Sequence, residues 1–360
     1  MQITSTRMHY SIKCWRSLTV LNRLPACLFQ TRSRPHSSIG GSSMNKPEFS
    51  VVIPLYNNAE QIINAIESVQ LQKYPVDEII VVDDGSTDNG AERIAQANLP
   101  KVRLISQNNQ GVAVARNTGV AHAKNPYIAF MNANDQWMPF FTEEMAMLIT
   151  HFPEAEFYAS RYQCIDQHGM CADARIRLPY VNPYGMLIDN YFSVASRGDT
   201  PFVMSSSVIK KTLFVETGGF PAGESAGEDQ ELFVKVALKG PIAYSPNVHV
   251  RYYRVAGKHV AETTAPVREC PFSARLGLRL KNSQMDEQLQ RDIERYCAAH
   301  LCHVARQNLL AGHYANALAL LNDTRANRKP VYKLLFGSLA LMGLIQQQVR
   351  APARWFKHSN

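Results

Sequence analysis

Three short polar clusters in the first half of the chain hold residues that could bind a charged ligand. The clusters are Tyr56 with Asn57, Asp83 with Asp84, and Asn132 with Asn134 and Asp135. Neighbouring carboxylates repel each other unless a cation or hydrogen-bond donors offset the repulsion. Asp and Asn oxygens can coordinate a hard divalent cation, although an amide brings no charge. The clusters therefore favour binding of a charged ligand, while an ordinary turn at residues 83–85 is the structural alternative.

Each cluster follows a segment with the pattern of a buried strand. Apolar and β-branched runs predict strands over residues 49–55, 78–82, 102–106 and 127–131. Helical periodicity lies between them, over residues 60–71, 88–97 and 111–124. This alternation predicts an α/β, Rossmann-like fold with a mostly parallel central sheet flanked by helices. Ligands bind such sheets outside the carboxyl ends of the strands, so we expect the three clusters to converge on one crevice.

The first predicted turn lacks the glycines that commonly bind phosphate. A dinucleotide site needs G-x-G-x-x-G directly after the first strand, but residues 54–58 read PLYNN. A Walker A sequence is also absent. A ligand with phosphates would therefore need a divalent metal, or an arginine such as Arg116, to neutralise its charge.

The basic charge of the chain is concentrated near its N-terminus. The formal net charge is +8, from 38 basic and 30 acidic side chains. Residues 1–43 hold six of the basic side chains and no acidic one, which leaves a net charge of +2 for the remainder. This near-neutral body argues against nucleic acid as a partner. We expect residues 1–43 to lie outside the fold, as an upstream extension before a true start at Met44, a disordered basic tail or a targeting peptide.

Cysteine usage and hydropathy favour a cytoplasmic protein. The seven cysteines are scattered, odd in number and lack the spacing of a zinc site, so free thiols in a reducing compartment are expected. No run of eighteen apolar residues occurs, so no transmembrane helix is predicted.

Six sequence blocks between Phe49 and Arg254 occur in an order typical of one enzyme family. They read FSVVIPLYNNAEQIINAIESVQLQ, EIIVVDDGSTD, NNQGVAVARNTGVAHA, YIAFMNANDQWMP, SSSVIKKTLFVETGGF and GEDQELFVKVALKG. In these blocks the chain resembles the inverting family 2 glycosyltransferases, which have the GT-A fold. The resemblance implies a hexosyltransferase that moves a sugar from a nucleotide-sugar to an acceptor hydroxyl with inversion.

The resemblance also implies roles for individual residues. The nucleotide-sugar site would comprise Pro54, Tyr56, Asn57, Asp83, Asp84, Gly111, Arg116 and Asn117. Within it, Asp84 would accept the uracil N3–H, and Arg116 with Asn117 would lie near the diphosphate. Asp229, with Glu228, would supply the general base that takes the acceptor proton. The dipole of a helix also favours acidic residues in its first turn, so a purely structural role for this pair is the alternative.

The chain departs from the family pattern at the metal site. The family usually has Asp-x-Asp-Asp after the fourth strand, whereas this chain has Asn132, Asn134 and Asp135. A histidine that follows Tyr-Arg in many members is absent after Arg254, and His259 has the wrong spacing. Three alternatives stay open: weak use of Mg²⁺ or Mn²⁺, a metal-independent transferase with an arginine or lysine at the diphosphate, or a degenerate, non-catalytic relative.

The second half of the chain is expected to form the acceptor side and a helical extension. Residues 44–260 would be the glycosyltransferase domain, with a variable loop at 179–199 whose aromatic residues either stack on a sugar or pack the loop. Residues 261–360 would be the extension, with helices at 286–310, 313–321 and 331–349. The last helix is apolar and flanked by Lys and Arg, so it either packs on the domain or contacts the inner face of a membrane.

Together these features predict a cytoplasmic glycosyltransferase that acts in cell-surface polysaccharide synthesis. Its expected donor is a UDP-sugar, and its expected acceptor is a glycan or a lipid-linked glycan. The competing hypothesis is a non-catalytic protein of the same fold that binds a nucleotide or a glycan.

Overall fold

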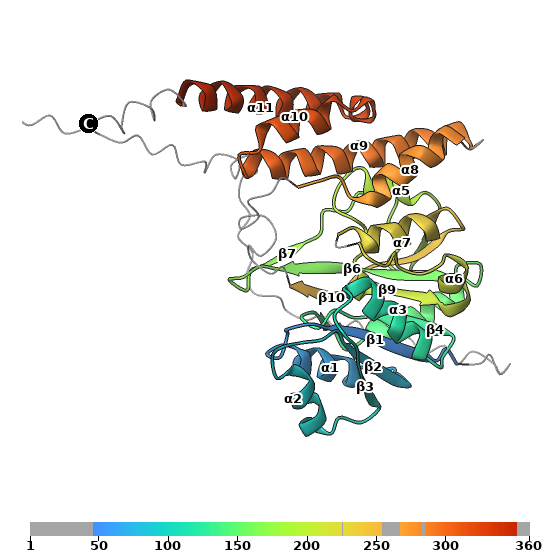
Figure 1. Ribbon diagram of the computed structural model, residues 1–360. Coiled ribbons are helices and arrows are strands. Elements are labelled where there is room, and N and C mark those ends of the chain that lie inside the picture. The colour runs from blue at the N-terminus through green and yellow to red at the C-terminus, as the bar shows by residue number, and fades with distance from the viewer. Residues whose placement is uncertain (1–45, 225, 254–266, 283–284, 351–360) are drawn as a thin grey trace, which may run out of the picture. The chain divides into compact units, whose positions relative to one another are not determined.

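The computed structural model of the chain describes residues 46–224, 226–253, 267–282 and 285–350. Within these residues ten strands form one sheet in the order β3-β2-β1-β4-β9-β6-β10-β5, with β7 beside β6 and β8 beside β10 (Figure 1). The strands are β1 Phe49–Leu55, β2 Glu78–Asp83, β3 Val102–Ser106, β4 Tyr127–Phe130, β5 Gln136–Trp137, β6 Phe157–Ile165, β7 Cys171–Asp173, β8 Met186–Ile188, β9 Ser207–Lys210 and β10 Ile242–Tyr253.

Helices cover both faces of the sheet and continue beyond it toward the end of the chain. They are α1 Ile62–Gln70, α2 Gly90–Ala97, α3 Val112–His122, α4 Phe141–His151, α5 Tyr191–Ala195, α6 Lys211–Glu216, α7 Glu228–Ala237, α8 Pro271–Asn282, α9 Glu287–Leu310, α10 Tyr314–Asn322 and α11 Pro330–Arg350. Two short 3₁₀ helices, η1 Met204–Ser206 and η2 Thr324–Arg328, connect some of them. The last three helices match their predicted bounds to within one residue at each end.

The sheet has a parallel part and a mixed part. Strand β1 pairs in parallel with β2 and β4, and β2 pairs in parallel with β3. Beyond β4, strand β9 runs antiparallel to both β4 and β6, while β6 and β10 are parallel. The first four strands are therefore all parallel, as expected, and the rest of the sheet is mixed, with β6 and β10 as a further parallel pair. The regular strand–helix alternation that signals parallel pairing ends near residue 131, and loop connections permit antiparallel pairing after that point.

Strand β1 shows how the two layers of the core are built. Val52 packs in the core layer under α3, α5, α6 and α7, whereas Val51 and Ile53 pack in the layer under α1, α2 and α4. All three side chains are fully buried. A strand covered on both faces reads as a continuous apolar run, which explains the lack of alternation over residues 49–55.

Helix α3 lies against the sheet at a glycine. A Cβ atom on Gly119 would lie 2.3 Å from Cγ1 of the buried Val52. We expect Gly119→Ala to lower the free energy of unfolding by about 1–3 kcal/mol, because the added methyl overpacks the core. Urea denaturation measures the loss. The control is Gly240→Ala, where a Cβ would meet no atom within 4 Å, and equal losses in the two variants would contradict this packing.

The segment 179–199 is more regular than the variable loop that the sequence predicts. It contains β8, which pairs with β10, and the short helix α5. Tyr191 and Phe192 are buried in the core, whereas Tyr180 and Tyr184 are exposed. The packing interpretation therefore holds for the first pair. Both elements were missed because three or five residues are too few to show a helical or strand period.

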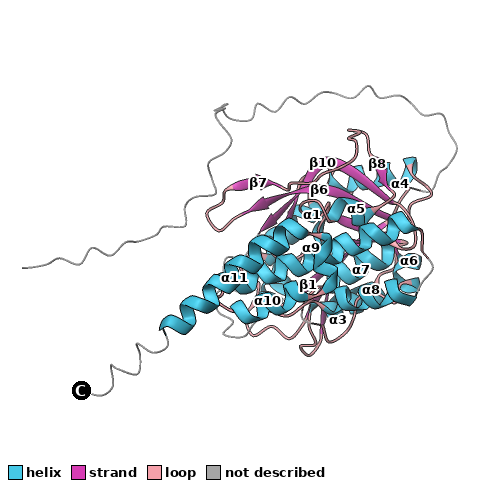
Figure 2. Ribbon diagram, turned by 90° about the horizontal axis from the view of Figure 1, so that it is seen from above, coloured by secondary structure: helices cyan, strands magenta, loops and turns pink. Residues whose placement is uncertain are grey.

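The C-terminal helices α9, α10 and α11 lie side by side (Figure 2). Ala340 of α11 packs with Ala317 of α10 and Ala305 of α9, so one face of the last helix is packed within the helical extension, whereas the packing interpretation expected it on the glycosyltransferase domain. Leu334 and Ile345 on the same helix remain exposed. Among the described residues no helix is long and apolar enough to cross a membrane. Contact of the exposed face with a membrane surface stays a prediction.

Candidate active site

The three polar clusters lie at one edge of the parallel sheet, as the strand order requires. Leu55 pairs with Asp83 at the ends of β1 and β2, and the N–H of Asp84 donates to the Leu55 carbonyl at 2.8 Å. After β4, the N–H of Met131 donates to the Val52 carbonyl. The chain segments that follow the three strands therefore start from neighbouring positions on the carboxyl edge, where ligands of such sheets bind.

Asp84 is buried and holds the loop that leads into α3. Its Oδ1 accepts from the Gln107 side chain at 2.7 Å and from the N–H of Gln110 at 2.9 Å. Its Oδ2 accepts from the N–H of Gly111 at 2.8 Å, and Gly111 has a φ of 89°. A positive φ is readily adopted only by glycine, so this residue fixes both the turn and the start of α3. The carboxylate therefore has a structural partner on each oxygen, in addition to the nucleotide role that the resemblance implies.

We expect Asp84→Asn to destabilise the protein by about 2–3 kcal/mol. An amide has only one acceptor oxygen, so its NH₂ group would face an N–H donor of the 107–111 loop. The loss is measured by urea denaturation, with the exposed Asp173→Asn as control. If Asp84→Asn and the parent protein have the same urea midpoint of unfolding, these hydrogen bonds contribute little to stability.

The turns after β1 and β2 are tied to each other. Asn57 has a φ of 50°, and its side-chain oxygen accepts from the N–H of Thr87 at 2.8 Å. The carboxylate of Asp83 accepts from the N–H of Ser86, whose hydroxyl accepts from the N–H of Asn57. Tyr56 is about half exposed beside them. Of the predicted nucleotide residues here, Tyr56 and Asn57 are both exposed, and Pro54 lies within β1.

Arg116 of α3 brings two distant parts of the chain together. Its Nη1 donates to Oε1 of Glu228 at 2.8 Å, and its Nη2 donates to Oδ1 of Asn132 at 3.1 Å. The guanidinium carbon lies 5.2 Å from the centre of the Phe220 ring. Arg116 is only 5% exposed, so these contacts form in a poorly solvated place where charge interactions are strong. One side chain therefore joins three of the predicted blocks.

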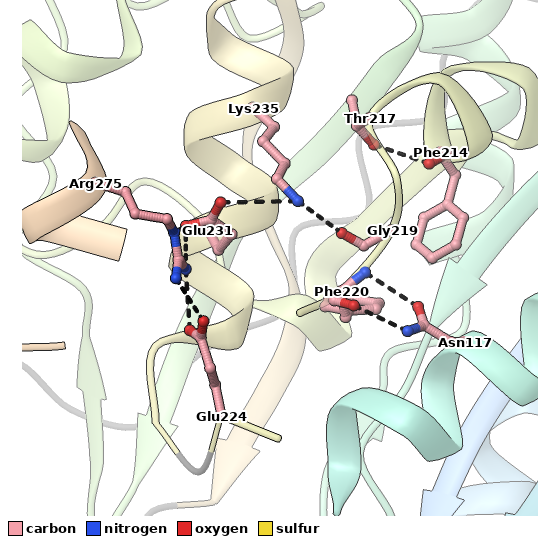
Figure 3. Close-up of polar contacts among 9 residues, drawn as sticks. All are labelled: Asn117, Phe214, Thr217, Gly219, Phe220, Glu224, Glu231, Lys235 and Arg275. Atoms are coloured by element: carbon pink, nitrogen blue, oxygen red, sulfur yellow. Dashed lines mark hydrogen bonds and ion pairs between the residues drawn. The ribbon is translucent and has the colours of Figure 1, made fainter. Parts of the chain in front are cut away.

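Asn117, next to Arg116, holds the glycine turn that follows α6. Its Nδ2 donates to the Phe220 carbonyl at 2.9 Å, and its Oδ1 accepts from the N–H of Phe220 at 3.0 Å (Figure 3). A Cβ on Gly219 would lie 2.8 Å from that Oδ1, so only glycine fits this turn. Asn117 thus fixes the residue whose ring packs on Arg116, and its place near a diphosphate stays a prediction.

Glu228 and Asp229 begin helix α7, where the helix dipole favours negative charge. Asp229 is partly exposed, and its Oδ1 accepts from the N–H of Gln230 at 2.7 Å. Desolvation and, to a lesser extent, the charge of Glu228 raise the pKa of Asp229 to about 6, although Arg116 and hydrogen bonds from Gln230 act in the opposite direction. A carboxylate with this pKa is largely ionised at neutral pH and is a stronger base than an exposed aspartate.

Asp135 and Asn134 both bind to the end of β10, and Asp135 also binds to Asn132. The carboxylate of Asp135 is fully buried and accepts from the Ser205 hydroxyl, from Nδ2 of Asn132 and from the N–H of Tyr253. Burial raises the pKa of Asp135 to about 6, although these hydrogen bonds act in the opposite direction. Asn134 donates to the Tyr253 carbonyl. Both side chains are used in joining the 132–135 turn to the end of β10.

These contacts do not fit a divalent metal at the three candidate positions. The Asn132 oxygen already accepts from a cation, Arg116, and the Asp135 carboxylate already has three donors. In the described part of the chain no three His, Cys, Asp or Glu side chains form a group that could hold a metal ion. Arg254 and His259 lie outside the described residues, so their part in such a site stays a prediction.

Several residues at the site lie in the quoted sequence blocks but were not predicted as site residues. Ser205 and Phe220 contact Asp135 and Arg116 from segments about 70 to 100 residues away. Gln230 directly follows the predicted base, so the sequence places it beside Asp229. The sequence does not show which distant residues contact the Gln230 side chain. Contacts of this kind depend on tertiary packing, which periodicity and spacing do not report.

Comparison with known proteins places this site in a family. The sequence profile of glycosyl transferase family 2 matches residues 50–211. The Escherichia coli protein WfaP, a UDP-Glc:alpha-D-GlcNAc-diphosphoundecaprenol beta-1,3-glucosyltransferase, is 31% identical over 209 residues, covering 57% of this chain and 76% of WfaP. The chain belongs to glycosyl transferase family 2. This membership confirms the family predicted from the six sequence blocks.

Other relatives of this family 2 chain are matched over a smaller share of their length. An uncharacterized glycosyltransferase of Rickettsia felis is 32% identical over 202 residues, which cover 55% of this chain and 32% of that protein. YibD of E. coli K12, also an uncharacterized glycosyltransferase, is 42% identical over 106 residues, which cover 29% and 30%. The chain thus spans only about a third of each of these two relatives.

Solved structures show the same fold at low sequence identity. Staphylococcus aureus TarS 1–349, in complex with UDP-GlcNAc, has a TM-score of 0.59 and is 16% identical, with 82% of this chain and 92% of TarS covered. This likeness confirms the GT-A fold expected from the sequence.

Proposed function

We propose that this chain is an inverting glycosyltransferase that moves a sugar from a UDP-sugar to a hydroxyl of a glycan or lipid-linked acceptor. The observation that carries the proposal is the convergence of Arg116, Asn132 and Glu228 beside Asp229 at the carboxyl edge of the sheet. The donor class is supported by TarS, which was crystallised with UDP-GlcNAc and with UDP, and by the name of WfaP. The same name supports a lipid-linked acceptor and a role in polysaccharide synthesis.

The proposed chemistry is a single displacement at the anomeric carbon. The carboxylate of Asp229 takes the proton of the acceptor hydroxyl, and the hydroxyl oxygen forms the new bond to carbon. The bond from that carbon to the β-phosphate oxygen breaks, and its electron pair leaves on UDP. The raised pKa of Asp229 suits this role, because the carboxylate is ionised at neutral pH and yet basic enough to accept a proton.

We further propose that Arg116, and not a metal held by residues 132–135, offsets the charge that develops on the leaving diphosphate. An aspartate at position 132 would give Arg116 a second carboxylate partner. Asn132 accepts a hydrogen bond without adding negative charge, so Glu228 is the carboxylate that pairs with the guanidinium. The Arg116 guanidinium therefore keeps more positive potential than it would beside two carboxylates. The poorly solvated surroundings strengthen its attraction for the negative charge of the diphosphate.

A non-catalytic, nucleotide- or glycan-binding protein is the second candidate. The amides at positions 132 and 134 favour it, because they remove two of the charges that the family normally places there. The retained Glu228 and Asp229 favour the enzyme, because a protein that only binds donor has no need of a base with this pKa.

Release of UDP by the full chain tests the proposal. UDP-glucose and UDP-N-acetylglucosamine are each incubated with GlcNAc-diphosphoundecaprenol, in the presence of EDTA. Acceptor-dependent UDP release that is lost in Asp229→Asn supports the enzyme. Binding of UDP-sugars without release from a wider panel of acceptors would favour the non-catalytic candidate.

A further inference from the structure

Gln230 lies between the candidate base and two buried tyrosines. Its Oε1 accepts from the hydroxyl of Tyr296 at 2.6 Å and from the hydroxyl of Tyr191 at 3.3 Å. The backbone N–H of Gln230 donates to Oδ1 of Asp229 at 2.7 Å, and the Gln230 side chain lowers the pKa of that carboxyl. The orientation of the amide is determined by these partners, because a carboxylate can only accept and must therefore face the NH₂ group.

The two tyrosines come from different parts of the chain. Tyr191 begins α5, and Tyr296 lies in α9 of the C-terminal helices. Both are almost fully buried, and their rings pack against each other with centroids 5.7 Å apart. Phe192 packs on the same two rings at 5.7 and 5.6 Å. Neither hydroxyl can turn to water, so the surrounding core holds them on Gln230.

The segment that precedes α7 is also tied to helix α8, which leads into the C-terminal helices. Arg275 of α8 forms ion pairs with Glu224, before α7, and with Glu231, in its first turn (Figure 3). A Cβ on Gly227, the residue before the helix, would lie 2.8 Å from Cβ of Cys270. The start of α7 is thus packed against residues on either side of the start of α8, and the base cannot shift without disturbing them.

We infer that Gln230, oriented by Tyr191 and Tyr296, is a positioning residue for the carboxylate of Asp229, and that α9 thereby completes the surroundings of the base. The inference deepens the proposed function and rests on it. The C-terminal helices then have a role at the site although none of the candidate site residues lies in them. Gln230 donates its amide hydrogen bond to the ionised carboxylate, which holds one rotamer and favours the charged form.

Other groups face Asp229 and set the background for this effect. Glu228 on the same helix opposes ionisation, and Arg116 of α3 favours it. Tyr191, Tyr296 and the thiol of Cys270 each have a pKa raised by desolvation and, to a lesser extent, by the charge of Asp229, so they stay neutral. On the side of Asp229 that faces α5 and α9, the titratable neighbours are therefore all neutral. The Gln230 amide is the donor on that side that favours the charged form of the Asp229 carboxylate.

Gln230→Met tests the inference, because methionine keeps the length of the side chain and removes both halves of the amide. With the full chain and UDP-glucose, we expect kcat to fall about tenfold with the donor KM unchanged within about twofold. The acidic midpoint of the pH profile of kcat/KM is expected to rise by about one pH unit, since a charge-assisted hydrogen bond to the ionised form is lost. Tyr296→Phe should shift the midpoint in the same direction by less.

A second readout does not depend on turnover. The pKa of the Asp229 carboxyl is followed by ¹³C NMR in protein labelled at aspartate, with Asp229→Asn identifying the signal. Phe192→Leu is the control, because it loosens the same aromatic cluster and leaves the hydrogen bonds to Gln230 in place. It should lower Tm without moving the NMR midpoint.

The outcomes separate the inference from the proposed function. An upward NMR shift in Gln230→Met, with no shift in Phe192→Leu, supports the role of the amide. Equal midpoints in the parent and Gln230→Met, or equal shifts in Gln230→Met and Phe192→Leu, would overturn it. If the parent releases no UDP from any donor, the proposed function fails, and the NMR result still decides whether Gln230 controls the carboxylate.

Discussion

Asp229→Asn is expected to lower the rate of sugar transfer by about 10²–10⁴-fold, the range that a positioned general base contributes. The amide keeps the shape of the side chain but cannot take the acceptor proton. Binding of UDP should change little, because Asp229 is not among the residues predicted to hold the nucleotide, which lie at or after the ends of β1, β2 and β3. The change is measured as acceptor-dependent UDP release, with UDP affinity measured by calorimetry on the same protein.

The stability of this variant gives an internal control. The folded-state pKa of Asp229 is about 6 and thus lies above its ordinary value of 3.8. The group therefore contributes stability below pH 3.8, and this contribution is lost as the pH rises through about 6. At pH 8 an uncharged Asn should leave Tm unchanged or raise it. Transfer that continues at the parent rate would show that Asp229 is not the base, and a clear fall in Tm at pH 8 would contradict its raised pKa.

Arg116→Lys is expected to have the second large effect. Lysine carries the charge but lacks the planar fork that reaches both Glu228 and Asn132, so one of the two contacts is lost. We expect donor affinity to fall at least tenfold and stability to fall by about 1–3 kcal/mol. Arg116→Met should cost about 3–5 kcal/mol, because it leaves the poorly solvated Glu228 without its cation.

The pH dependence distinguishes the two variants at residue 116. Arg116 lowers the pKa of Asp229, so its replacement by Met should raise that pKa above about 6 and move the acidic limb of the activity profile upward. Lysine keeps the charge and should move it less. Lys211 of α6 is a cation that donates to a backbone carbonyl away from this site, and Lys211→Met is the matched control. Equal losses of donor affinity at residues 116 and 211 would contradict the role given to Arg116.

The sequence was informative where a property depends on neighbours along the chain. The strands over residues 49–55 and 102–106 were predicted to the residue, because short runs rich in apolar and β-branched residues and bounded by turns leave few alternatives. Their parallel order then placed the polar ends at one edge. Arg116 was also predicted as a candidate cation, since the missing glycines left a charge to be neutralised.

The sequence was less informative where a property depends on packing between distant segments. Asp135 carries the one retained carboxylate of the family motif, yet it is buried under Ser205 and Tyr253, from segments about 70 and 120 residues away. The link from Tyr296 to Gln230 likewise joins residues 66 positions apart. Such contacts arise only when the sheet and its helices are assembled, so spacing could not reveal them.

The central claim is that the carboxyl edge of the sheet binds a UDP-sugar with Arg116 in place of a protein-held metal. The most direct measurement is the Tm of the full chain with UDP and UDP-sugars, each with Mn²⁺ and with EDTA. Ligand at 100 times its Kd stabilises the folded state by about 2.7 kcal/mol, a rise of about 5 °C for a chain of this size. We expect the same rise with Mn²⁺ and with EDTA. A rise that needs Mn²⁺, or no rise with any uridine nucleotide, would contradict the claim.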